Sequence, residues 1–115
     1  MMINETRLLN EFLEFVQIDS ESGNEHRMGE KLVQVLNGLG IEVTCDRAGE
    51  TFGSNGFNVF ARLPGEGEPI VLSAHMDTVA PGVGVKPTIR DGVIYSDGTT
   101  VLGGDDKSGI CGILE

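Results

Sequence analysis

Two amphipathic helices are predicted in the first part of the chain. Apolar side chains recur at helical spacing over residues 5–17 and again over a segment that follows Ser22 and ends near residue 40. Asn4 suits the N-cap of the first helix, and Ser22 with Glu25 has the spacing of a capping box for the second. The two apolar faces consist of Leu9, Phe12, Leu13 and Val16, and of Met28, Leu32, Val35, Leu36 and Leu39.

Strands are predicted in the middle of the chain. Residues 41–45 and 57–63 alternate between apolar and polar positions, as half-buried strands do. Residues 70–74 are almost all apolar or small, which predicts a strand buried on both faces. Two further short runs flank the pair 91–92 (Asp-Gly), a turn typical of hairpins, and a last helix is predicted from Lys107 onward. We therefore expect the α/β class, with helices packed on a mixed sheet.

Composition narrows the possible partners. The chain has 115 residues, which allows one domain at most, and 39% of them are hydrophobic. Its net charge is −10, from 18 acidic and 8 basic residues, which argues against binding to a nucleic-acid backbone. The sequence contains neither an apolar run long enough for a bilayer nor the features of a signal peptide. We expect a cytoplasmic protein with no nucleic-acid or membrane partner, whose Cys45 and Cys111 are free thiols.

Candidate chemistry lies at two places. His75 and Asp77 are two positions apart where a predicted strand ends, so their side chains should project to the same side. The imidazole could bind a metal through one nitrogen while the carboxylate accepts the other N–H group. Asp105 and Asp106 follow two glycines at the start of the last predicted helix. Imidazole and carboxylate groups are ligand types that zinc uses in proteins.

Each of these pairs also has a simpler interpretation. His75 and Asp77 could be a hydrogen-bonded pair on the surface, as such pairs often are. Asp105 and Asp106 could cap the last helix, because Asp is favoured at an N-cap and complements the helix dipole. Spacing alone leaves both interpretations open.

Four segments taken together resemble the dinuclear zinc peptidases that include peptidase T, glutamate carboxypeptidase and aminoacylase. The resemblance is strongest to peptidase T-like aminopeptidases. The segments are HMDTV at 75–79, VKP at 85–87, SDGTT at 96–100 and LGGDDKSG at 102–109. Each motif by itself is weak, but their order and joint presence are specific.

The resemblance implies a role for each matching residue. His75 corresponds to the family's first histidine ligand of zinc, and Asp77 to the catalytic-site carboxylate that orients this histidine. Asp105 corresponds to the carboxylate that bridges the two zinc ions of the active site, and the peptide bond after it, to Asp106, is expected to be cis. Lys107, like Asp106, would be a neighbour of the site rather than a ligand.

The resemblance also implies that residues 1–115 are the N-terminal portion of a catalytic domain. The family's general-base Glu and its remaining zinc ligands would lie beyond Glu115, together with a dimerisation or lid domain. We expect the full-length parent to be a zinc metallopeptidase, an aminopeptidase of tripeptidase type that acts on short peptides. We expect the 115-residue chain alone to be inactive and to self-associate through unpaired strand edges.

Two alternatives remain from the sequence. One is an amidase, deacylase or carboxypeptidase of the same family, because all of these share the residues present here. The other is a non-catalytic acidic α/β module in which residues 105–106 only cap a helix.

Overall fold

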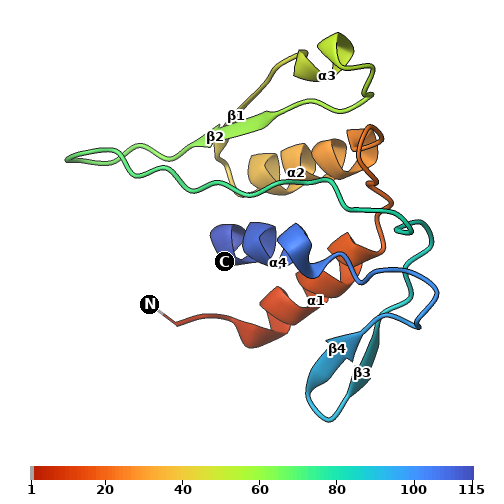
Figure 1. The fold of residues 1–115 in the computed structure, drawn as a ribbon. Coiled ribbons are helices and arrows are strands. Elements are labelled where there is room, and N and C mark those ends of the chain that lie inside the picture. Colours follow the sequence, from red (N-terminus) through yellow and green to blue (C-terminus); the bar gives the residue numbers. More distant parts are fainter. Residues whose placement is uncertain (1) are drawn as a thin grey trace.

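The fold is taken from a computed structural model that describes residues 2–115 (Figure 1). The elements in chain order are α1 (Glu5–Val16), α2 (His26–Gly38), β1 (Glu42–Cys45), α3 (Ala48–Thr51), β2 (Val59–Arg62), β3 (Thr88–Arg90), β4 (Val93–Tyr95) and α4 (Gly104–Leu114). None of the helices within residues 2–115 is long and apolar enough to cross a membrane.

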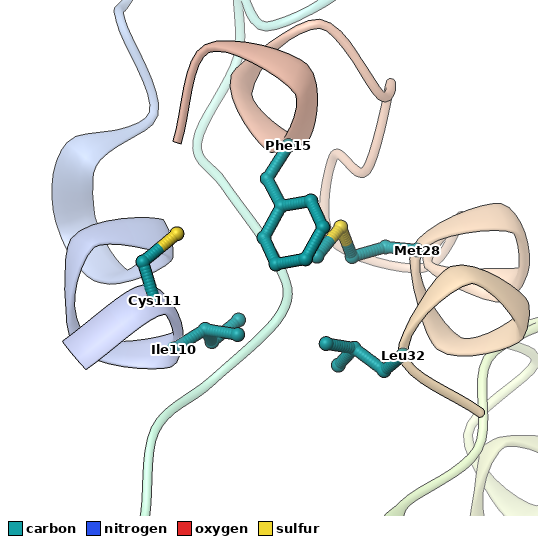
Figure 2. Packing of buried hydrophobic residues seen from close by; sticks show 5 residues of the cluster. All are labelled: Phe15, Met28, Leu32, Ile110 and Cys111. Atoms are coloured by element: carbon teal, nitrogen blue, oxygen red, sulfur yellow. The ribbon is translucent and has the colours of Figure 1, made fainter. Parts of the chain in front are cut away.

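Three helices enclose the core. Phe15 of α1 lies between Met28 and Leu32 of α2 and two residues of α4, Ile110 and Cys111 (Figure 2). Ala74 and Met76 pack against this cluster from an extended segment that runs between α2 and α4 (Figure 1). Burial of these apolar side chains is what holds the first and last helices together, although about ninety residues of chain separate them. The segment that carries His75 is thereby tied to the core.

The strands form two small antiparallel sheets. In one, β1 pairs with β2, and in the other β3 pairs with β4. Asp91 and Gly92 both have positive φ, 51° and 74°, as a two-residue hairpin turn requires, so the predicted hairpin is confirmed. A single parallel bridge joins Glu21 to Thr78. The predicted α/β class is confirmed, with these two sheets and the isolated bridge as its β structure.

The predicted buried strand at residues 70–74 is wrong. The backbone there is extended but belongs to no strand, and Ile70 and Val71 are 87% and 86% exposed. An apolar run becomes a buried strand only when neighbouring strands pair with it and other elements cover its faces. No segment within residues 2–115 does this for residues 70–72.

The two predicted helix caps have different outcomes. The Asn4 side chain accepts a hydrogen bond from the backbone N–H of Arg7, so the N-cap of α1 is confirmed. The capping box at α2 is wrong: the N-cap residue is Glu25, without a side-chain cap, and the Ser22 hydroxyl donates to Asp77 instead. The two cysteines are free, as predicted, Cys45 exposed and Cys111 buried.

Candidate metal centre

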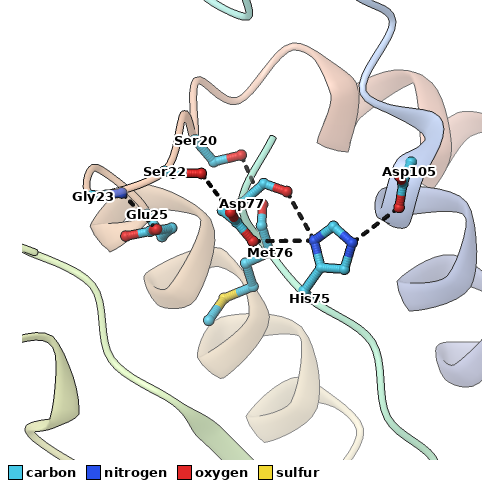
Figure 3. Close-up of polar contacts among 8 residues, drawn as sticks. All are labelled: Ser20, Ser22, Gly23, Glu25, His75, Met76, Asp77 and Asp105. Atoms are coloured by element: carbon cyan, nitrogen blue, oxygen red, sulfur yellow. Dashed lines mark hydrogen bonds and ion pairs between the residues drawn. The ribbon is translucent and has the colours of Figure 1, made fainter. Parts of the chain in front are cut away.

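The extended segment after residue 73 presents alternate side chains to opposite sides. Ala74 and Met76 face the helical core, and therefore His75 and Asp77 face away from it (Figure 3). The predicted same-side placement of His75 and Asp77 is confirmed by their contact. The His75 side chain remains 51% exposed, so the imidazole is accessible to a ligand.

The imidazole of His75 has an oxygen on each side. Its Nδ1 lies 2.9 Å from the backbone oxygen of Asp77 and 3.1 Å from Asp77 Oδ1. Its Nε2 lies 2.9 Å from Asp105 Oδ1 (Figure 3). A carbonyl and an ionised carboxylate only accept hydrogen bonds, so Nδ1 must carry a hydrogen. Nε2 faces only the Asp105 carboxylate, and a metal could take the place of the hydrogen between these two atoms.

Asp105 reaches His75 because the chain before α4 approaches the His75 segment closely. Gly103 has φ of 85°, and a Cβ atom placed on it would lie 3.3 Å from Thr78 Cγ2. Glycine is favoured there because it accepts positive φ and needs no side-chain space. The peptide bond from Asp105 to Asp106 is cis, as the resemblance implies. Asp105 and Asp106 have non-helical backbone angles within α4, so the regular helix begins after them, and the Asp106 carboxylate lies beside Gly109. This placement is compatible with the helix-cap interpretation.

The carboxylates of Asp77 and Asp105 favour positive charge at His75. Burial lowers the pKa of His75, but the hydrogen bond to Asp105 and the contacts with Asp77 outweigh this and raise the pKa above 6.5. The Ser22 hydroxyl holds the pKa of Asp77 below its usual value, aided by the charge of His75. The Asp105 side chain is 94% exposed, so this carboxylate is open to solvent.

The Nε2–Asp105 pair fits a zinc ion by chemistry. A deprotonated Nε2 and a carboxylate oxygen are both acceptors, and at 2.9 Å they need a cation, either a proton or a metal, between them. Tetrahedral zinc would hold such a pair about 3.3 Å apart, so a small adjustment of the exposed Asp105 side chain admits it. Within residues 2–115, no three His, Cys, Asp or Glu side chains converge as one metal site. The structure thus brings Asp77 to the other ring nitrogen, and two residues of this chain, His75 and Asp105, remain as candidate metal ligands.

Two residues near the site have contacts that the sequence analysis did not predict. Ser22 bonds to Asp77, and the buried Lys107 donates from Nζ to the backbone oxygen of Ile18 at 2.6 Å. The Ser-x-x-Glu pattern favoured a local cap, and no sequence signal indicated a partner 55 positions away. At the other end of α4, the Glu115 carboxylate accepts hydrogen bonds from the Arg7 side chain and from the backbone N–H of Asn4.

Solved structures match this fold along its whole length. An aminopeptidase PepT from Bacillus cereus superimposes with a TM-score of 0.91, and a tripeptidase from Staphylococcus aureus with 0.87. Each is 43% identical to this chain, and each match covers 100% of this chain and 32% of the other. The resemblance to peptidase T-like proteins is confirmed.

Related sequences extend the peptidase T-like match. YqjE of Bacillus subtilis, a protein of uncharacterised function, is 43% identical over 99% of this chain and 31% of its own length. Peptidase T of Bacillus cereus is 28% identical over 93% of this chain and 36% of its own. A probable carboxypeptidase of Aspergillus oryzae is 35% identical over 70% of this chain and 19% of its own. No protein-family model matches. The chain spans about a third of the length of YqjE and of peptidase T.

Proposed function

We propose that the protein containing this chain is a zinc-dependent aminopeptidase that hydrolyses short peptides. Residues 1–115 would be the N-terminal portion of its catalytic domain. The observation that carries the proposal is the opposition of His75 Nε2 and Asp105 Oδ1 at 2.9 Å, a pair that a proton can bridge and that a zinc ion could bridge in its place. The similarity in fold to an aminopeptidase and a tripeptidase supports peptide hydrolysis over other metal chemistry.

The chain's own residues would act by binding and orienting. His75 would bind metal through Nε2, because its Nδ1 carries a hydrogen directed at Asp77. Asp105 would bind through Oδ1, and its exposed second oxygen is open to a second ion of a zinc pair. Asp77 would keep the ring in one tautomer and one orientation. When bound, zinc polarises the scissile carbonyl and lowers the pKa of a water molecule.

Within this proposal the 115-residue chain is inactive on its own. Two protein ligands are fewer than the three that catalytic zinc sites commonly use. A general base is also needed to take the proton of the attacking water. We propose that a Glu outside these residues supplies it, since Glu115 lies at the opposite end of α4 from Asp105 and is bound by Arg7.

Hydrolysis of a tripeptide by the full-length protein tests the proposal. Activity should be lost on zinc removal, return with zinc, and fall sharply in His75→Ala and Asp105→Asn. His26→Gln and Asp91→Asn are matched controls at exposed positions away from the site, and they should retain activity. Cleavage that persists without metal, or that survives His75→Ala, would contradict the proposal.

The second candidate is a carboxypeptidase, amidase or deacylase with the same metal centre. The similarity of this chain to a probable carboxypeptidase supports this second candidate. Three substrates separate these activities: a free tripeptide, its amino-blocked form and its carboxyl-amidated form. An aminopeptidase needs the free amino group, whereas a carboxypeptidase needs the free carboxylate. Absence of hydrolysis and of zinc binding together would favour the non-catalytic module.

A further inference from the structure

We propose that Ser22 is a positioning residue of the metal centre, whose hydroxyl fixes the carboxylate of Asp77 and through it the imidazole of His75. The inference rests on the proposed function in one respect, that His75 is a metal ligand. Ser22 is neither a ligand nor in contact with the imidazole, and it would act only through Asp77.

The Asp77 carboxylate is held at both of its oxygens. Ser22 Oγ donates to Oδ2 at 2.5 Å, and Oδ1 lies 3.1 Å from His75 Nδ1 (Figure 3). A carboxylate held at one oxygen can rotate about its terminal torsion, because that torsion is broad. Held at both oxygens, it has one orientation. The Ser22 hydroxyl thus decides where Oδ1 lies for the imidazole.

The backbone around Ser22 is itself fixed to the His75 segment. Ser22 N–H donates to Thr78 O at 3.1 Å, and Thr78 N–H donates to Ser20 O at 2.9 Å. The fully buried Ser20 hydroxyl donates to Met76 O at 2.9 Å. These bonds run along the parallel bridge, so the connection between α1 and α2 lies in register beside residues 76–78. Ser22 is therefore held in place without depending on its own side chain.

The other end of this connection is fixed to the Asp105 side of the centre. Lys107 Nζ donates to Ile18 O at 2.6 Å, and Lys107 lies two residues after Asp105. One short segment, residues 18–22, thus contacts both parts of the chain that carry the candidate ligands.

The test is NMR of the His75 Nδ1–H group in the metal-free 115-residue chain. The chain has two histidines, so His26 serves as an internal reference for folding. In Ser22→Ala, the Nδ1–H resonance should move in the direction that Asp77→Asn moves it, and the proton should exchange faster with water. Ser22→Thr keeps the hydroxyl and should restore the wild-type signal. Ser96→Ala is the matched control, since the half-buried Ser96 hydroxyl accepts a hydrogen bond from Gly98 N–H, away from the candidate centre.

A double-mutant cycle completes the test. Adding Ser22→Ala to Asp77→Asn should change the resonance no further, because Ser22 acts through that carboxylate. The inference is overturned if Ser22→Ala leaves the resonance unchanged, or if its effect is undiminished in the Asp77→Asn background. Ser22 is exposed, and loss of its hydroxyl should leave the fold intact. If Ser22→Ala nevertheless unfolds, Ser22→Cys, a weaker donor of similar size, should give a smaller shift in the same direction, and no shift would overturn the inference.

Zinc titration of the same variants separates this inference from the proposed function. Ser22→Ala should weaken zinc binding by up to about tenfold, the lower end of the effect of groups that support a metal ligand. If zinc binds but Ser22→Ala alters neither the imidazole nor the affinity, only the inference fails. If Ser22→Ala alters the imidazole but no variant binds zinc, the positioning role stands and the proposed function fails.

Discussion

The buried ammonium group of Lys107 should make the stability of the chain depend on pH above neutrality. Lys107 is 2% exposed, its Nζ donates to Ile18 O, and Asp19 is the one charged group that raises its pKa. Loss of hydration outweighs this and lowers the pKa of Lys107 from 10.5 to about 8. The unfolded chain therefore binds more protons than the folded chain between these values, and the free energy of unfolding should rise with pH.

The size of this effect follows from the difference between the two pKa values. Each pKa unit corresponds to about 1.4 kcal/mol, so the rise between pH 7 and pH 9 should be roughly 1 kcal/mol. Above pH 9 Cys111 opposes it, because burial raises the pKa of this thiol from 9.0 to about 12 and the unfolded chain ionises first. The range from pH 7 to 9 therefore shows Lys107 most clearly.

Urea unfolding at pH 7, 8 and 9, with a chelator present, measures the effect. Lys107→Met keeps the length of the stem but removes the charge, and it should abolish the rise. Lys86→Met removes a charge from an exposed lysine, and the rise in the free energy of unfolding with pH should remain. The difference between wild type and Lys107→Met also cancels the titration of His75 and Cys111. Stability that is flat between pH 7 and 9, or an equal rise in Lys107→Met, would refute the reasoning.

Three further predictions concern the metal site and the surface. In the full-length protein, Asp77→Asn should retain most of the zinc but lower turnover about 10–100-fold, as loss of a group that orients a ligand does; unchanged turnover at saturating zinc would contradict this. Calorimetry of the 115-residue chain should show at most one weak zinc site, and this site should need His75. Zinc binding should weaken as the pH falls through the raised pKa of His75, because a ligating imidazole must be unprotonated. Two tight zinc sites would contradict the assignment of His75 and Asp105. The same chain should self-associate through the exposed, unpaired run Ile70–Leu72, and Val71→Lys should reduce this in sedimentation; a wild-type monomer at all concentrations would speak against it.

Features that depend on neighbouring residues were predictable from the sequence. The helices α1 and α2 and the Asp-Gly turn at 91–92 depend on patterns over a few residues, and the structure has all of them. The predicted apolar faces are only partly correct, because Leu9 and Leu39 are exposed and the fully buried Phe15 was not among the predicted residues. The common side of His75 and Asp77 follows from extended backbone alone. The resemblance of the four motifs indicated the cis peptide after Asp105, which neither composition nor spacing could have indicated.

Only the tertiary structure decided which distant groups meet. His75 and Asp105 are 30 positions apart, and they lie together because α1, α2 and α4 share one core and Gly103 approaches Thr78 closely. The same packing turned Ser22 away from a local cap toward Asp77. A serine hydroxyl can bond to its own neighbouring backbone or to a distant group, and the parallel bridge, a contact between distant segments, places the charged Asp77 carboxylate beside it. The predicted burial of residues 70–74 was wrong for the same reason. An apolar run shows that a segment can be buried, but it does not show which other segment covers it.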